Sequence, residues 1–132
     1  MKNKAIWIVD DDAIYQIIIT KLIQKTALFS AHSSFLNGDE ALNTLKKIVD
    51  NDDDLVPDII LLDINMPVMD GWEFMEEIKN LKSSIKKHIH IYIVSSSISV
   101  EDKNKAKTYT YIMGYIPKPI TVNELIAIVS NE

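Results

Sequence analysis

Ile59-Ile60-Leu61-Leu62-Asp63 is an apolar run followed by a charged side chain, and two other segments of the chain repeat this arrangement. Asp10-Asp11 follows the apolar run Ile6-Trp7-Ile8-Val9, and Lys118 comes directly after Tyr115-Ile116-Pro117. The carboxyl ends of strands in an open parallel sheet converge on one crevice, so side chains that are distant in sequence can meet there. The three segments therefore predict an acidic pocket with a lysine over it, a fitting place for a divalent cation and a phosphoryl group.

Apolar runs rich in β-branched residues alternate with helical patterns along the chain. The predicted strands are residues 5–9, 30–35, 58–62, 90–94 and 113–116, and the predicted helices are residues 13–25, 39–49, 71–81, 100–109 and 121–130. Five strands, each followed by a helix, predict a doubly wound α/β fold with a five-stranded parallel sheet covered on both faces. Thr121 and Glu124 have the spacing of a capping box, which sets the start of the last helix.

Length and composition exclude several classes of protein. A chain of 132 residues with 47% hydrophobic content predicts a single domain over residues 1–132 with one core and no output domain. It has no apolar stretch of about 18 residues or more, so we expect neither secretion nor membrane spanning. It has no cysteine, which favours a cytoplasmic protein. All 14 basic residues are lysines and the net charge is −5, so nucleic-acid binding is not expected.

Asp10 and Asp11 are candidate metal ligands. Like-charged neighbours in a crevice repel each other unless a cation lies between them or one of them is protonated. Mg²⁺ resolves this repulsion, because it takes one or two carboxylates and keeps several waters. The alternative is that these acids only cap the first helix, the role that we expect for Asp12.

The segment Asp63 to Gly71 adds a candidate nucleophile. A carboxylate at a strand end, followed by a turn that contains Pro67, is held outward and available for covalent chemistry. Asn65 could present its backbone carbonyl to the same metal, whereas Asp70-Gly71 is typical of a turn and helix start. A strand-end aspartate can otherwise be a simple helix cap.

Two further groups could reach a phosphoryl oxygen at the same edge. Ser95-Ser96-Ser97 ends the fourth predicted strand, and Lys118 follows the fifth. Phosphoryl transfer requires neutralisation of the equatorial oxygens, which a divalent ion, a lysine and a hydroxyl provide together. The three serines could alternatively form only a turn that leads into a helix.

Val9-Asp10-Asp11, the segment Asp63 to Gly71, Ser95 and Lys118-Pro119 together resemble the receiver domain of response regulators, of the CheY-like kind. The resemblance covers essentially the whole chain. It implies a flavodoxin-like sheet with the strand order 2-1-3-4-5. It also implies a two-component signalling protein that accepts a phosphoryl group from a histidine kinase or a histidine phosphotransfer protein.

The resemblance assigns roles to individual residues. It implies phosphorylation of Asp63, Mg²⁺ ligation by Asp11, Asp63 and the Asn65 carbonyl, and a supporting or water-mediated metal role for Asp10. It further implies that Lys118 pairs with the phosphoryl group and that a hydroxyl bonds to it after activation. Ser95 fits this last role best, because it ends the apolar run.

The same resemblance implies a switch and not a metabolic enzyme, since such a chain catalyses only its own phosphorylation and dephosphorylation. Tyr115 falls at the family's aromatic switch position, although it could simply pack its ring at the sheet edge. The face of the fourth helix, fifth strand and fifth helix is the expected contact for a downstream protein. We expect a monomer, or a weak dimer linked to phosphorylation.

The first helix has more apolar residues than one buried stripe requires: Ile14, Ile17, Ile18, Ile19, Leu22 and Ile23. The surplus isoleucines predict a docking patch for a kinase or a phosphotransfer helix. The fourth helix is rich in charged residues and poor in apolar ones, so we expect it to be loosely held.

Three other functions share parts of this pattern. A phosphatase of the haloacid-dehalogenase type requires a second acid two residues after the nucleophile, where this chain has Asn65. A flavodoxin requires a phosphate loop after the first strand, where Asp10, Asp11 and Asp12 would repel the flavin phosphate. The third alternative is a receiver fold that serves as an interaction module without phosphorylation.

Overall fold

The computed structural model describes residues 4–51, 55–81, 84–85 and 87–131. The strands are β1 (Lys4–Val9), β2 (Phe29–Phe35), β3 (Ile59–Leu62), β4 (His90–Ser95) and β5 (Ile112–Pro117). The helices are α1 (Ala13–Thr26), α2 (Gly38–Asn51), α3 (Gly71–Leu81), α4 (Val100–Ala106) and α5 (Val122–Ser130). All strands pair in parallel in the order β2-β1-β3-β4-β5, which confirms the expected doubly wound sheet.

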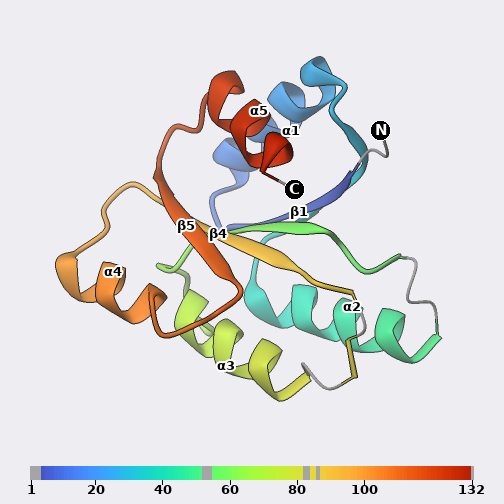
Figure 1. Cartoon of the computed structure of the whole chain (residues 1–132), viewed down its shortest axis with the longest axis vertical. Helices are drawn as coiled ribbons and strands as arrows, with labels where there is room; N and C mark the ends of the chain where they lie inside the picture. Colours follow the sequence, from blue (N-terminus) through green and yellow to red (C-terminus); the bar gives the residue numbers. More distant parts are fainter. Residues whose placement is uncertain (1–3, 52–54, 82–83, 86, 132) are drawn as a thin grey trace.

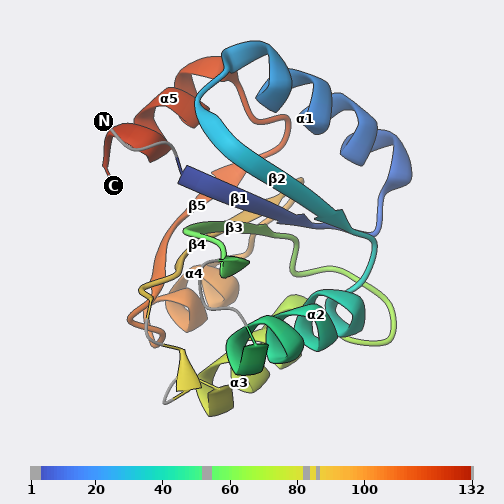
Figure 2. The ribbon, with the colours of Figure 1, turned by 90° about the vertical axis from the view of Figure 1, so that its right-hand side faces the viewer.

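The sheet lies between two layers of helices, with α1 and α5 on one face and α2, α3 and α4 on the other (Figures 1 and 2). Alternate residues of β1 point to opposite faces. Ile6 and Ile8 join the core under α1 and α5, whereas Trp7 and Val9 join the core on the α2 and α3 side. Burial on both faces explains why the central strands are continuous apolar runs and do not alternate with polar residues.

Side-chain caps start α1 and α5 at the predicted places. Asp12 is the N-cap of α1, and its Oδ1 accepts the backbone N–H groups of Ile14 (3.0 Å) and Tyr15 (3.1 Å). Thr121 and Glu124 form the predicted capping box at the start of α5. Both caps satisfy backbone donors that have no partner within the first helical turn.

One predicted boundary is clearly wrong, because α4 ends at Ala106 and not at residue 109. The chain leaves the helix after Lys107 and buries Tyr109, whose hydroxyl donates to Glu76 Oε2 at 2.6 Å. The Tyr109 ring also stacks on Trp72 of α3, with 6.1 Å between the centroids. These contacts between α3 and the α4–β5 connection have no signature in local periodicity.

Within the described part of the chain, no helix has both the length and the apolar character that crossing a membrane requires.

Candidate functional site

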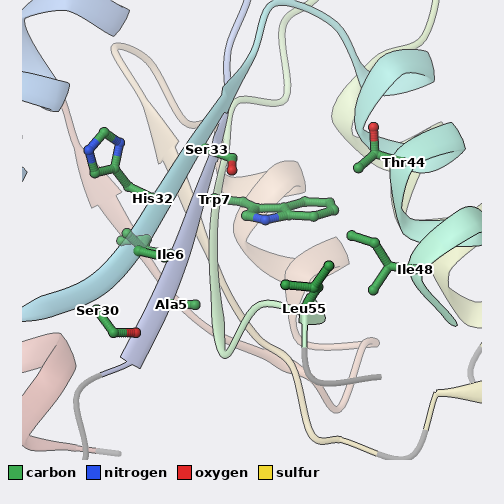
Figure 3. Close-up of a pocket in the computed structure, with 10 residues that line it drawn as sticks. Ala5, Ile6, Trp7, Ser30, His32, Ser33, Thr44, Ile48 and Leu55 are labelled. Carbon is green, nitrogen blue, oxygen red and sulfur yellow. The ribbon is translucent and has the colours of Figure 1, made fainter. Parts of the chain in front are cut away.

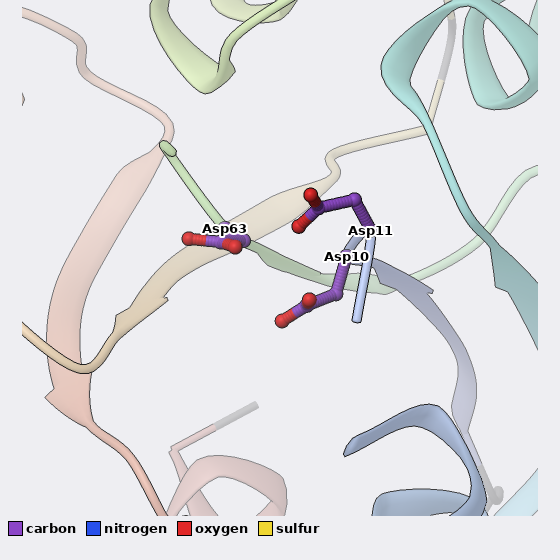
Figure 4. Close-up of side chains that lie close together, drawn as sticks. All are labelled: Asp10, Asp11 and Asp63. Carbon is purple, nitrogen blue, oxygen red and sulfur yellow. The ribbon is translucent and has the colours of Figure 1, made fainter. Parts of the chain in front are cut away.

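Strand register brings the first two predicted acids together. β1 and β3 are neighbours, with Val9 opposite Leu62, so Asp10 and Asp63 leave adjacent strands at the same edge. One carboxylate oxygen from each of Asp10, Asp11 and Asp63 lies within 4.8 Å of the other two (Figure 4). Asp10 and Asp63 are buried, with exposed fractions of 1% and 6%, whereas Asp11 is exposed.

Lys118 reaches the two buried acids from the end of β5. Its Nζ lies 2.7 Å from Asp10 Oδ2 and 3.6 Å from Asp63 Oδ2. Its backbone N–H donates to the carbonyl of Ser95 (3.0 Å), which ties the Lys118 loop to the end of β4. The predicted acidic pocket with a lysine over it is therefore present.

Burial and neighbouring charges shift the proton affinities of the site. Burial raises the pKa of Asp63 above its ordinary value of 3.8, helped by the charges of Asp10 and Asp11, and outweighs the N–H of Asn65 and the charge of Lys118. Burial alone would lower the pKa of Lys118, but the hydrogen bond and charge of Asp10, together with Asp63, raise it. The carboxyl group of Asp63 thus loses its proton less readily than an ordinary aspartic acid, and Lys118 holds its proton more tightly than an ordinary lysine.

The chemistry of these donors fits a hard divalent cation. Three clustered carboxylates carry more negative charge than one ammonium can balance. Asp10 is already bonded on both oxygens, because its Oδ1 accepts the N–H of Asp12 (2.9 Å) and its Oδ2 pairs with Lys118. The exposed carboxylate of Asp11 is an oxygen donor of the kind that Mg²⁺ takes, and Asp63 Oδ2, at 3.6 Å from Lys118 Nζ, is the more loosely held oxygen of Asp63.

The loop after Asp63 depends on a close backbone approach. The N–H of Asn65 donates to Asp63 Oδ1 (3.2 Å), and the N–H of Gly71 donates to the carbonyl of Ile64 (3.0 Å). A Cβ at Gly71 would lie 2.6 Å from the Ile64 Cα, so this fold of the loop requires glycine. Asp70 starts α3 as predicted, since its Oδ1 accepts the N–H of Glu73 (2.8 Å).

The hydroxyl and the aromatic ring predicted to respond to phosphorylation both lie outside the acid cluster. Ser95 is buried, whereas Ser96 and Ser97 are exposed. The Ser95 hydroxyl donates to the carbonyl of Ser97 (2.9 Å) and accepts its N–H (3.3 Å). Tyr115 is 43% exposed, and Lys103 Nζ of α4 lies 5.0 Å from its ring centroid.

Two residues at the site were missed by sequence reasoning. Gln16 is buried, and its Nε2 lies within hydrogen-bond distance of the carbonyls of Ile8 (3.2 Å), Asp10 (3.1 Å) and Phe35 (3.0 Å), which ties the ends of β1 and β2 together. A lone amide within an isoleucine-rich helix was a usable signal for it. Tyr15 places its ring centroid 4.5 Å from Lys118 Nζ, a contact that has no sequence signal.

A second hollow of the molecule has different chemistry (Figure 3). It lies between β1, β2 and α2, and none of the lining residues that the structure describes is an acid or a lysine. The lining residues are Ala5, Ile6, Trp7, Ser30, Ala31, His32, Ser33, Thr44, Ile48 and Leu55. The charged groups of the chain that suit phosphoryl chemistry are at the carboxyl end of the sheet instead.

Known proteins share this fold and this sequence pattern. The protein-glutamate methylesterase/protein-glutamine glutaminase of Treponema pallidum is 38% identical over 88 residues, which are 64% of this chain and 20% of that protein. The chain therefore spans about a fifth of the length of that relative. A two-component response regulator from Cytophaga hutchinsonii is 30% identical, with full coverage of both chains and a TM-score of 0.87.

Two structures of 23% identity share the fold alone. One is the receiver domain of the histidine kinase CKI1 from Arabidopsis thaliana complexed with Mg²⁺, which matches 97% of this chain and 90% of that chain with a TM-score of 0.83. The other is the receiver domain of Ssk1 in a co-crystal with the Saccharomyces cerevisiae phosphotransfer protein Ypd1, which matches 97% and 87% with a TM-score of 0.78. Residues 6–130 match the family described as the response regulator receiver domain, and the chain belongs to that family.

Proposed function

We propose that this chain is a phosphorylation-controlled switch that accepts a phosphoryl group on Asp63 from a phosphohistidine of a histidine kinase or a histidine phosphotransfer protein. The observation that carries the proposal is the position of Asp63, between two further carboxylates and the Lys118 ammonium. Membership of the receiver family supports the same chemistry.

In the proposed reaction, a carboxylate oxygen of Asp63 attacks the phosphorus as the P–N bond to the donor histidine breaks. The histidine nitrogen keeps the electron pair of the P–N bond and takes a proton from water. In the dephosphorylation step, water attacks the phosphorus, the carboxylate of Asp63 leaves and inorganic phosphate is released. The chain would therefore catalyse only its own phosphorylation and dephosphorylation.

Asp11, Asp63 and the Asn65 carbonyl would hold Mg²⁺, with Asp10 in a supporting or water-mediated role. The bound ion would supply positive charge to the phosphoryl oxygens. Lys118 would neutralise a further oxygen. Ser95 would exchange its present bonds to Ser97 for a bond to the phosphoryl group.

The test is the intact mass of the chain after incubation with acetyl phosphate, with and without Mg²⁺. We expect a Mg²⁺-dependent gain of one phosphoryl group in wild type and in Asp70→Asn, and no gain in Asp63→Asn. Asp70 is the matched control, because it is an aspartate of the same loop with a capping role. No gain in wild type would contradict the proposal and favour an interaction module that works without phosphorylation.

We further propose that α1 docks the protein phosphodonor. Ile14, Ile17 and Ile18 have exposed fractions of 70%, 57% and 57%, which is a large apolar area for one helix surface. Ile17→Glu should slow transfer from a phosphorylated histidine phosphotransfer protein and leave transfer from acetyl phosphate unchanged. Leu55→Glu, which changes a 59% exposed leucine elsewhere, is the control. Equal transfer rates in both variants would exclude this docking surface.

The downstream partner would contact the face formed by α4, β5 and α5. Exposed apolar side chains of this face come from all three elements: Val100, Met113, Tyr115, Val122 and Ile126. Tyr115 would turn inward when Ser95 moves toward the phosphoryl group, so the partner surface would differ between the two states.

A further inference from the structure

Tyr15 is fixed beside the acid cluster by the start of α1. It is the third residue of the helix, and its backbone N–H donates to the capping carboxylate of Asp12 at 3.1 Å. Its half-buried ring packs against the core between the sheet and the α1 and α5 layer. The cap therefore fixes the backbone of Tyr15, and the core supports its ring.

The face of this ring covers the ammonium of Lys118. Lys118 Nζ lies 4.5 Å from the ring centroid, and it is also 2.7 Å from Asp10 Oδ2 and 3.6 Å from Asp63 Oδ2. A cation within about 6 Å of an aromatic centroid is attracted by the ring, more strongly where water is excluded. The Lys118 side chain is only 17% exposed, so the contact is largely shielded from water.

The position of the Lys118 ammonium has to be fixed by its contacts, because a lysine ammonium is strongly hydrated and is carried by a flexible four-carbon chain. The two carboxylates attract the charge but do not define which way the stem runs. The ring closes one side of the ammonium and leaves the side of Asp10 and Asp63 open. An aliphatic side chain of similar size would fill space there without attracting the cation.

We propose that Tyr15 is a positioning residue for Lys118, whose aromatic face holds the ammonium against the acids where a phosphoryl group on Asp63 would form. This role rests on the proposed function of Asp63. The hydroxyl is not needed for it, since it is buried and none of the described residues is its hydrogen-bond partner. Phenylalanine should therefore serve as well as tyrosine.

Acetylation of amines measures the position of Lys118 without phosphoryl transfer. The chain is treated briefly with acetic anhydride, and the label on Lys118 is compared by peptide mass spectrometry with the label on the exposed Lys21. Tyr15→Leu and Tyr15→Met should raise the relative labelling of Lys118 by about threefold to tenfold, because the cation contact and the shielding are lost. Tyr15→Phe should match wild type. Leu22→Ala removes apolar volume that packs against the same core, and its relative labelling of Lys118 should also match that of wild type.

The rate of phosphorylation by acetyl phosphate is measured on the same variants across a range of Mg²⁺ concentrations. The Leu and Met variants should lose about threefold to tenfold in maximal rate, with the half-saturating Mg²⁺ concentration unchanged, because the ring contacts the ammonium and not the metal ligands. Tyr15→Phe should keep the wild-type rate. A purely structural role would instead lower the rate in Leu22→Ala as well.

Unchanged labelling in both the Leu and the Met variant would overturn the proposal. Raised labelling with an unchanged rate would also overturn it, as would a Phe variant that is as impaired as Leu. A wild-type chain that takes up no phosphoryl group would overturn the proposed function of Asp63, and the role of Tyr15 with it. Because labelling does not depend on phosphoryl transfer, the two failures are distinguishable.

Discussion

The acid cluster and helix α4 lie near the same end of the sheet but are held in opposite ways. Asp10 and Asp63 directly follow β1 and β3, whose residues Ile6–Val9 and Ile59–Leu62 are buried. In α4, a helix of seven residues, Ala106 alone is buried. The acids therefore cannot move without disturbing the core, whereas α4 can move at the cost of a few side-chain contacts.

Besides the buried Ala106, α4 makes polar and aromatic contacts. Trp72 Nε1 donates to Asp102 Oδ1 (3.3 Å), and Lys105 Nζ lies 5.2 Å from the Trp72 ring centroid. Just beyond the helix, Tyr109 donates to Glu76, and burial together with this hydrogen bond raises the pKa of Tyr109 to about 12. Tyr109 thus remains a donor at neutral pH. The comparison suggests that the strands and the acid cluster form a rigid frame for phosphoryl chemistry. Helix α4 and the connection to β5 would form an adjustable surface for partners.

The largest expected effect is a loss of stability when the acid cluster of the rigid frame loses its lysine. Lys118→Met leaves two buried carboxylates without their cation, so we expect a loss of about 3 kcal/mol in the free energy of unfolding without Mg²⁺. Lys87→Met removes a more exposed pair with Asp58 (3.3 Å) and should cost about 1 kcal/mol or less. Urea denaturation measures both. Equal losses would show that the acid cluster is not specially dependent on its lysine.

A smaller effect is expected on the adjustable side. Trp72→Leu removes the stack with Tyr109 and the bond to Asp102, so the amides of α4 should exchange about tenfold faster with deuterium. Amides of β1 and β3 should change little, because the side chains of these strands remain buried in the cores on both faces of the sheet. Tyr109→Phe, which loses only a hydroxyl, should give a smaller increase. Faster exchange throughout the sheet would argue against a separately held α4.

The charge of Asp63 gives a pH dependence. Because burial raises the pKa of Asp63, the folded chain keeps this proton to higher pH than the unfolded chain does, and stability falls as pH rises through the raised pKa. Without Mg²⁺, Asp63→Asn should therefore melt about 4 °C above wild type at neutral pH. The difference should shrink as pH falls toward 4. Asp70→Asn should melt with wild type, and a difference independent of pH would contradict the electrostatic cause.

The smallest effect concerns strain in the loop of the site. Val68 has a φ of 70°, in the left-handed region that a β-branched residue rarely adopts. Val68→Asn should raise the free energy of unfolding by about 0.5–1 kcal/mol, because asparagine tolerates this conformation. Val100→Asn, at another exposed valine, is the control and should give no gain. A lower free energy of unfolding for Val68→Asn would mean that the contacts of the valine side chain stabilise the fold by more than the backbone strain costs.

The rigid side of the molecule was predictable from sequence, and most of the adjustable side was not. Strands such as Ile59–Leu62 can be recognised in the sequence as apolar runs. Because β1 and β3 pair in parallel, Asp10 and Asp63 at their carboxyl ends lie close together. The boundary of α4 and its attachment through Trp72 and Tyr109 depend on residues about thirty positions apart, which no local period reveals. Tyr15 was missed for the same reason, because its partner Lys118 is at the other end of the chain.

The most direct test of a rigid frame coupled to an adjustable surface is hydrogen–deuterium exchange with Mg²⁺, before and after addition of beryllium trifluoride as a stable stand-in for the phosphoryl group. We predict that amides of α4 and β5 change their exchange by about tenfold while those of β1 and β3 stay slow, and that Asp63→Asn shows no change. Unchanged amide exchange in α4 and β5 of wild type, or an equal change in exchange across the whole sheet, would contradict a rigid frame coupled to an adjustable surface.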